Sequence, residues 1–199
     1  MFLFFRGNFR LRKKFLNDKI IHSNHYIFVF LRWREIMFEK GDYVVNSNNG
    51  ICEINDIVTM NMGNGDKKCY VLIPIEERKA KIFIPIDTAE KRIRLAMNKD
   101  EAWRIIKEIS AVDEAFVENE REREKFYKET INSREPKRLI SIMKMLYIRK
   151  QKRLEEGKKI TSVDERYFKL AENQLYGELA FALGVEKSEI NQIIEQNIE

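Results

Sequence analysis

Basic side chains gather in the second half of the chain, where their type and spacing suit binding to phosphate groups. Residues 134–169 contain twelve Lys and Arg against five Asp and Glu, a net charge of +7. The neighbouring segments are acidic, with −4 over residues 100–133 and −5 over 170–199. Each phosphate that such a cluster neutralises releases counterions, so it would bind DNA with a strong salt dependence. The candidate DNA-binding residues are Lys137, Arg138, Lys144, Arg149, Lys150, Lys152, Arg153, Lys158, Lys159, Arg166 and Lys169.

The same cluster has a simpler interpretation, as the solvated face of helices whose basic residues pair with carboxylates four positions away. The overall net charge of +5 does not decide between the two, because it comes from the start of the chain. Residues 1–36 carry eight basic and two acidic residues, which leaves 29 basic and 30 acidic residues for the other 163.

Groups that could support catalysis or hold a metal ion are missing from the sequence. Gly157-Lys158-Lys159 lacks the Ser or Thr that follows the lysine of a phosphate-binding loop, and no HExxH or GxSxG motif occurs. The only histidines, His22 and His25, lie in the first 36 residues. Cys52 and Cys69 form no CxxC pair, so we expect them to pack as reduced, small apolar residues in strands of a cytoplasmic protein. The sequence therefore predicts no enzyme, no cofactor and no metal site.

The first 36 residues do not read as part of a fold. Their apolar run precedes the basic one, the reverse of a signal peptide, and the YIFVFL stretch is far too short to span a membrane. The codons of Trp33-Arg34 can spell a bacterial ribosome-binding sequence shortly before Met37. We therefore expect translation to begin at Met37, with residues 1–36 as a mistranslated leader or a disordered extension.

Two kinds of periodicity divide the rest of the chain. Short runs rich in Val, Ile, Tyr and Phe, separated by Gly- and Asn-containing turns, predict four or five short strands between Phe38 and about Leu95, with clear runs at 42–45, 50–60, 67–75 and 80–86. Pro85 lies late in the last of these, which indicates a free strand edge there. Apolar residues at helical spacing then predict helices over 98–109, 112–131, 133–156, 161–184 and 186–196.

Details of the helical half refine this prediction. Pro136 suits a helix start, and Leu139, Ile142, Met143 and Leu146 form one apolar stripe after it. Ser162 and Glu165 have capping-box spacing, and Gly184 suits a helix end. The expected fold is α+β with two domains: a small SH3/Tudor-like β-barrel over 37–97, followed by an all-α helical bundle over 98–199.

The strand region carries a specific resemblance. FEKGDYVVNSNNGICEI, followed by KCYVL and IFIP, resembles the N-terminal module of the CarD/CdnL family, which also occurs in transcription-repair coupling factors. ERYFKLAENQLYGELAFAL, from Glu165 to Leu183, is similar to the last long helix of that family. The resemblance covers about Met37 to Gly184 and itself begins at Met37. The matching glycines, Gly41 and Gly50, suit turn conformations that other residues resist.

The resemblance implies a bacterial transcription regulator. Its Tudor-like barrel would bind the RNA polymerase β subunit along an exposed strand edge, and its helical domain would contact promoter DNA and modulate open-complex stability. Met60 and Phe83 stand where the family often has arginines, and Pro85 matches its strand-end proline. The polymerase-binding residues implied are Met60, Met62, Lys81, Phe83 and Pro85.

The sequence departs from the family at the tryptophan that many members insert at the DNA fork. The matching position falls near Glu120, which cannot stack on a base and would be repelled by phosphate. Phe126 or Tyr127 could replace it, although we expect both to pack inside, as we expect Trp103 to do. The rival function is a protein-interaction adaptor that docks on polymerase or another partner without binding DNA. A monomer is expected in either case.

Overall fold

The structure is a computed structural model that describes residues 38–61, 63, 65–117 and 119–197. The predicted leader at 1–36, the expected start at Met37 and the candidate residue Met62 lie outside the described residues.

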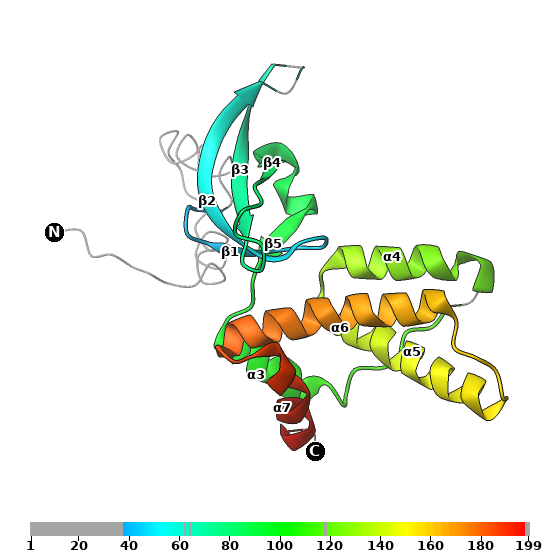
Figure 1. Cartoon of the computed structure of the whole chain (residues 1–199). Coiled ribbons are helices and arrows are strands. Elements are labelled where there is room, and N and C mark those ends of the chain that lie inside the picture. The colour runs from blue at the N-terminus through cyan, green and yellow to red at the C-terminus, as the bar shows by residue number, and fades with distance from the viewer. Residues whose placement is uncertain (1–37, 62, 64, 118, 198–199) are drawn as a thin grey trace, which may run out of the picture. The chain divides into compact units, whose positions relative to one another are not determined.

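The predicted strands form one antiparallel sheet in the order β4-β3-β2-β1-β5 (Figure 1). Gly41 and Gly50 have positive φ angles of 89° and 64°, which confirms that both occupy turn conformations. A fifth strand, to which the sequence pattern assigned no range, pairs with β1 on the side away from β2. The strands are β1 (Tyr43–Asn46), β2 (Gly50–Asn61), β3 (Asp66–Pro74), β4 (Ile82–Pro85) and β5 (Ile93–Leu95).

The sheet does not close, so the prediction of a β-barrel is wrong. Closure requires a hydrogen-bonded ladder between the first and last strands. Here β4 pairs with β3 and β5 pairs with β1, and the 3₁₀ helix η1 (Ile86–Lys91) connects the two without a ladder in the described part of the chain. Strands of four and three residues leave little backbone for such a ladder. The free edge predicted from Pro85 is confirmed, because β4 is an edge strand.

The second half of the described chain is helical. Its elements are α3 (Lys99–Glu108), η2 (Glu120–Glu122), α4 (Arg123–Ser133), α5 (Pro136–Glu155), α6 (Ser162–Leu183), η3 (Lys187–Glu189) and α7 (Ile190–Asn197). Pro136 opens α5 and Gly184 ends α6 in the left-handed conformation, as predicted. None of the helices in the described residues is long and apolar enough to cross a membrane.

Two helical predictions need correction. The helix expected from Val112 begins only at η2 and α4, and the side chain of Asn119 accepts a hydrogen bond from the Arg121 N–H at that start. The N-cap of α6 is Thr161 rather than Ser162, because the Thr161 Oγ1 accepts the Asp164 N–H at 3.1 Å. Adjacent hydroxyl residues make such caps ambiguous in a sequence.

Buried apolar residues lie both in the sheet and in the helical half, and α6 contacts β2 as well as α3, α4, α5 and α7 (Figure 1). The stripe on α5 is confirmed, since Leu139, Ile142 and Leu146 are buried and Met143 packs against them. Trp103 also packs against this core. Cys52 and Cys69 are both fully buried in strands, as predicted, and burial raises the pKa of the Cys52 thiol to about 11. Burial thus keeps the Cys52 thiol protonated at neutral pH.

Candidate functional site

One face of the sheet brings together three of the residues implied to bind polymerase. Val71 lies opposite Phe83, and Cys69 lies opposite both Pro85 and Val58. Residues opposite each other share a face, and so do residues two apart in a strand, so Met60, Phe83 and Pro85 project on the same side. Phe83 is 37% exposed, and Met60 and Pro85 are half-buried. We call Met60, Phe83 and Pro85 the sheet-face cluster.

The outer edge of β4 adjoins this cluster. No strand in the described part of the chain pairs with that edge, so its backbone groups can take an added strand from a partner. Lys81, which is exposed, immediately precedes β4 and places a cation at its start. A partner strand would therefore find backbone donors and acceptors beside an apolar cluster.

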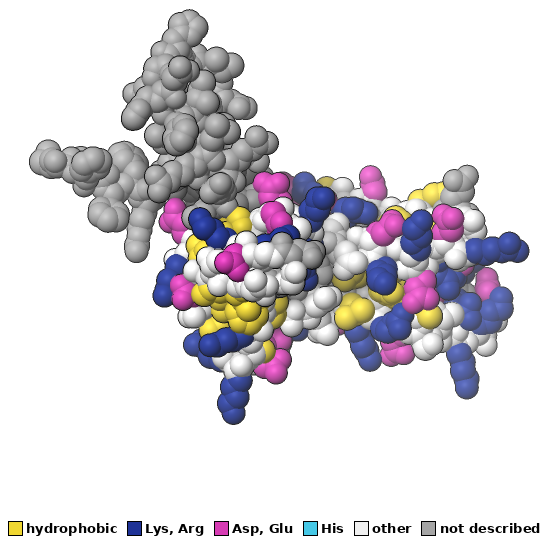
Figure 2. All heavy atoms as spheres, turned by 90° about the horizontal axis from the view of Figure 1, so that it is seen from above, with side chains coloured by type: hydrophobic (Ala, Val, Ile, Leu, Met, Phe, Trp, Pro, Cys, Tyr) yellow, Lys and Arg dark blue, Asp and Glu magenta, His cyan; other side chains and the backbone are white. Residues whose placement is uncertain are grey.

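The candidate DNA-binding residues extend over α5, the loop after it and the start of α6. Figure 2 shows Lys and Arg side chains projecting from this end of the helical part, with Asp and Glu side chains between them. Four of the eleven form no hydrogen bond or ion pair through their side chains with the residues that the structure describes. These are Arg138, Lys150, Lys152 and Lys159.

Three of the eleven bind groups inside the helical half. Lys144 Nζ donates to the carbonyl oxygens of Ser110 at 3.0 Å and Val112 at 2.6 Å. These hydrogen bonds connect α5 to the segment after α3. Arg149 is only 27% exposed and binds Asp164 and Glu120. Arg153 donates through Nε to the Lys159 carbonyl at 2.9 Å. The remaining four form exposed ion pairs: Lys137 with Glu108, Lys158 with Glu156, Arg166 with Glu124 and Lys169 with Glu165.

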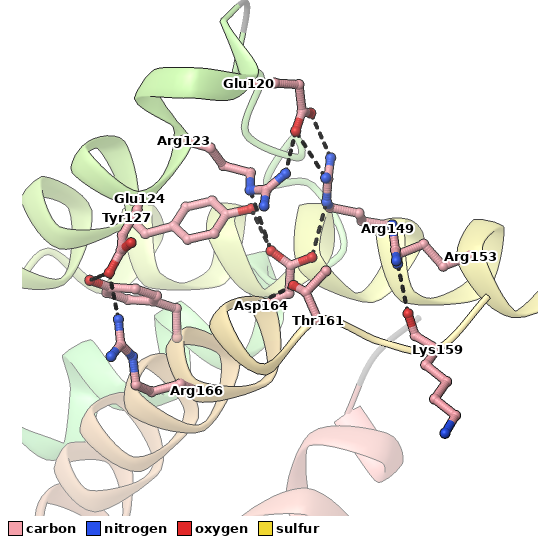
Figure 3. A network of polar contacts seen from close by, with 11 residues as sticks. Glu120, Arg123, Glu124, Tyr127, Arg149, Arg153, Lys159, Thr161, Asp164 and Arg166 are labelled. Atoms are coloured by element: carbon pink, nitrogen blue, oxygen red, sulfur yellow. Dashed lines mark hydrogen bonds and ion pairs between the residues drawn. The ribbon is translucent and has the colours of Figure 1, made fainter.

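A buried carboxylate joins α4, α5 and α6 (Figure 3). Asp164, in the first turn of α6, accepts from the Tyr127 hydroxyl and from Arg149 Nε, each at 3.1 Å. Arg123 Nε lies 3.5 Å from the carboxylate oxygen that accepts from Tyr127. Burial, with the nearby Asp164 carboxylate second, raises the pKa of Tyr127 well above its usual value. Tyr127 is fully buried and Phe126 packs against the same core, so neither is free to stack on a base.

Glu120 closes this network on its exposed side. Its two carboxylate oxygens accept from Arg149 Nη1 at 2.7 Å and Nη2 at 3.0 Å, and Arg123 Nη1 binds the second oxygen as well. The hydrogen bond from Arg149 is the main cause that lowers the pKa of Glu120. Glu120 thus carries an ionised side chain that binds two arginines.

A second buried carboxylate connects the sheet to the helices. Glu178 of α6 is 1% exposed and accepts from Arg94 of β5 through both oxygens, at 2.5 and 2.6 Å, and from the Met97 N–H at 2.9 Å. Arg94 also donates to the Arg134 carbonyl at 2.7 Å, and Arg134 donates to Ser47 at 3.3 Å. We call Arg94, Arg134 and Glu178 the clasp. It joins β5 to α6 and to the end of α4.

Sequence reasoning missed both networks and one exposed aromatic residue. Phe116, in the segment before η2, is 83% exposed and lines a shallow depression with Val117 and Phe126. Charge patterns do not show which ion pairs are buried, because the partners lie far apart in the chain. The sequence pattern places Phe116 in a helix, so its exposure could not be foreseen. Within the described residues, no group of His, Cys, Asp and Glu could hold a metal ion.

The fold and surfaces define a class of protein before any comparison. A small open sheet with an unpaired edge and an apolar cluster, fixed to a helical half with free cations, is typical of a module that binds other macromolecules.

The comparison with family models identifies the module. Residues 38–97 match the CarD-like/TRCF RID domain, so this part of the chain is a CarD-like domain of the kind that interacts with RNA polymerase in transcription. The resemblance seen in the strand motifs is confirmed. No curated protein matches the chain.

Proposed function

We propose that this protein is a non-enzymatic, cytoplasmic transcription regulator. It binds the RNA polymerase β subunit through the sheet-face cluster and the β4 edge. Its free cations on and after α5 contact promoter DNA, and the two contacts together modulate the stability of the open complex. The match of residues 38–97 to the polymerase-interacting family carries this proposal.

The sheet supports the polymerase contact in two ways. The register gathers Met60, Phe83 and Pro85 on one face, beside an edge strand whose outer side pairs with no strand of the described chain. Apolar and aromatic side chains at the centre of an interface contribute most of its binding energy, while added backbone hydrogen bonds align the partner.

Replacing Phe83 with Glu is expected to weaken polymerase binding by more than about tenfold, because a charge would be buried in the apolar centre of the interface. The measurement is the affinity of the full chain for RNA polymerase core. Thr59→Glu is the matched control, since Thr59 is exposed on β2 next to Met60 and projects from the opposite face. Equal weakening in both variants, or none in either, would reject this face as the docking surface.

The basic residues support the DNA contact. Arg138, Lys150, Lys152 and Lys159 have charges that no carboxylate in the described residues neutralises by an ion pair. Contacts to phosphates would position DNA along α5 and carry little sequence information. This arrangement suits a regulator whose target promoter is selected by the polymerase.

Replacing Lys150, Lys152 and Lys159 together with Gln is expected to weaken binding to a promoter fragment. The slope of log K against log salt should become shallower by about 0.9 for each phosphate that the variant no longer binds. The matched control removes three lysines of the helical half outside residues 134–169, namely Lys107, Lys125 and Lys128. If the affinity of both triple variants falls equally, the effect is one of net charge and DNA does not lie along α5.

The adaptor function remains the second candidate, because Phe116 favours it. Phe116 is 83% exposed and follows Asp113 and Glu114, whose charges would repel DNA but not a protein. Exposed aromatic residues are frequent anchors of protein interfaces. Polymerase binding with no salt-dependent DNA binding would establish the adaptor.

A further inference from the structure

Two arginines of the helical half point their terminal nitrogens at one exposed place (Figure 3). The Nε atoms of Arg123 and Arg149 face inward, 3.5 and 3.1 Å from the buried Asp164 carboxylate. Their Nη atoms face outward, and three of these bind the carboxylate of Glu120. Asp164 holds the two guanidinium groups from behind and is itself fixed by the Tyr127 hydroxyl, so the donors are pre-oriented.

Glu120, whose carboxylate the Nη atoms bind, is the most exposed residue of this network. The side chain of Glu120 is 62% exposed, whereas those of Arg123, Arg149 and Asp164 are 18%, 27% and 5% exposed. Exposed ion pairs contribute little to stability, because water solvates the released charge well. Glu120 can therefore leave while the two arginines stay on Asp164.

The charge of the network determines which kind of group could take the place of the Glu120 carboxylate. With Glu120 the four charges sum to zero, and without it the two arginines and Asp164 carry +1. Protonation does not release Glu120 near neutral pH, since the hydrogen bond from Arg149 lowers the pKa of this carboxyl. Another anion must displace it. Guanidinium forks bind carboxylate and phosphate with the same two-point geometry.

The geometry points to a phosphate-binding site formed by Arg123 and Arg149, in which Glu120 is an internal competitor. A phosphate group takes the position of the Glu120 carboxylate, and the Nη atoms donate to its oxygens. The inference deepens the DNA contact proposed above and rests on it only for the source of the phosphate. Lys150, Lys152 and Lys159, which lack ion-pair partners in the described structure, belong to the helix of Arg149 and the loop after it.

The first test uses inorganic phosphate and the full chain, without DNA or polymerase. Glu120→Gln keeps the size of the side chain and removes its charge. When phosphate replaces chloride at equal ionic strength, the Tm of this variant is expected to rise by more than that of the wild type, because ligand binding adds to the general stabilisation that phosphate gives both proteins. The same shift in wild type and variant would mean that Glu120 does not compete, which rejects the proposal.

The second test uses a short DNA duplex, again without polymerase. Glu120→Gln is expected to bind about tenfold more tightly, with a salt slope steeper by about 0.9, which corresponds to one additional phosphate bound. Asp87→Asn is the matched control, since it removes one charge from an exposed ion pair with Lys67 on the sheet half. An equal increase in affinity in both variants would show a general charge effect and overturn the site.

The third test separates geometry from charge. Glu120→Gln combined with Arg149→Lys has the same net charge as Glu120→Gln alone but lacks one guanidinium fork. The increases in phosphate and DNA binding should both disappear, and their persistence would contradict the proposal. Should this variant fail to fold, Arg123→Lys in the same background gives the same comparison. If phosphate raises the Tm of Glu120→Gln but the affinity of this variant for DNA does not increase, the site exists and binds free phosphate. That outcome rejects the DNA contact and leaves the phosphate site in place, so the two failures can be distinguished.

Discussion

Glu178→Ala is expected to lower the free energy of unfolding by about 3–5 kcal/mol, which is the usual cost of removing one partner of a buried ion pair. The carboxylate is 1% exposed, so the change removes the only carboxylate that pairs with Arg94 in the described residues, and the acceptor of the Met97 N–H. Chemical denaturation followed by circular dichroism measures this decrease. It is a large share of the roughly 5–15 kcal/mol that stabilises a typical domain.

Glu178→Ala is also expected to affect the proposed contacts with RNA polymerase and with promoter DNA differently. The sheet-face cluster lies on the strands, away from Glu178 in the chain, so polymerase binding should persist where the protein remains folded. The DNA contribution to complex stability should fall, because the helical half then loses a contact that joins it to β5. Polymerase–promoter complexes assembled with wild type and variant measure this directly.

Two further variants test whether the loss of stability comes from the clasp. Glu172→Ala removes a carboxylate of the same helix that forms none of the ion pairs seen in the described residues, and it should cost little. Arg94→Met combined with Glu178→Leu should recover part of the stability, since replacing both partners leaves no unpaired charge. Recovery will be incomplete because Arg94 also donates to the Arg134 carbonyl. A decrease below about 1 kcal/mol for Glu178→Ala would show that the clasp does not hold the halves together.

Asp164→Ala should have a comparable effect, about 3–5 kcal/mol, because this carboxylate is 5% exposed and lies between two arginines. The Tyr127 hydroxyl would also lose its acceptor inside the core. The backbone cap from Thr161 to residue 164 survives in the variant, so the decrease reports the side chain alone. The measurement is again the free energy of unfolding.

Glu165→Ala is the control for this prediction. Glu165 is the next residue in the same turn, and its exposed carboxylate pairs with Lys169 at 3.4 Å. Exposed pairs of this kind contribute about 0–1 kcal/mol. Equal destabilisation by the two variants would contradict the role assigned to Asp164 and would point to a general effect on the N-terminus of α6.

Local patterns were sufficient for most elements of the fold. Runs of β-branched and aromatic residues predicted four or five strands, and the stripe from Leu139 to Leu146 predicted the buried side of α5. The position of the fifth strand could not be assigned, because three residues, Ile93–Leu95, are too short for a pattern. Barrel closure could not be predicted either, since it depends on whether two short edge strands meet.

For the candidate surfaces, too, the sequence predicted one part and the structure was needed for the other. The strand motifs by themselves identified the polymerase-interacting family, because those residues encode the turns and the alternation that define its sheet. They could not show which face gathers Met60, Phe83 and Pro85, since that follows from the register of three strands.

The sequence by itself determined the class of the module, the approximate positions of most helices and the segment where positive charge accumulates. Only the tertiary structure decided which of those charges are free. Lys144 and Arg149 fit the basic pattern as well as Lys150 and Lys152 do, yet their partners are residues 15 to 34 positions away. The physical reason is that the cost of burying a charge depends on what the fold places beside it, which residue type and spacing alone do not record.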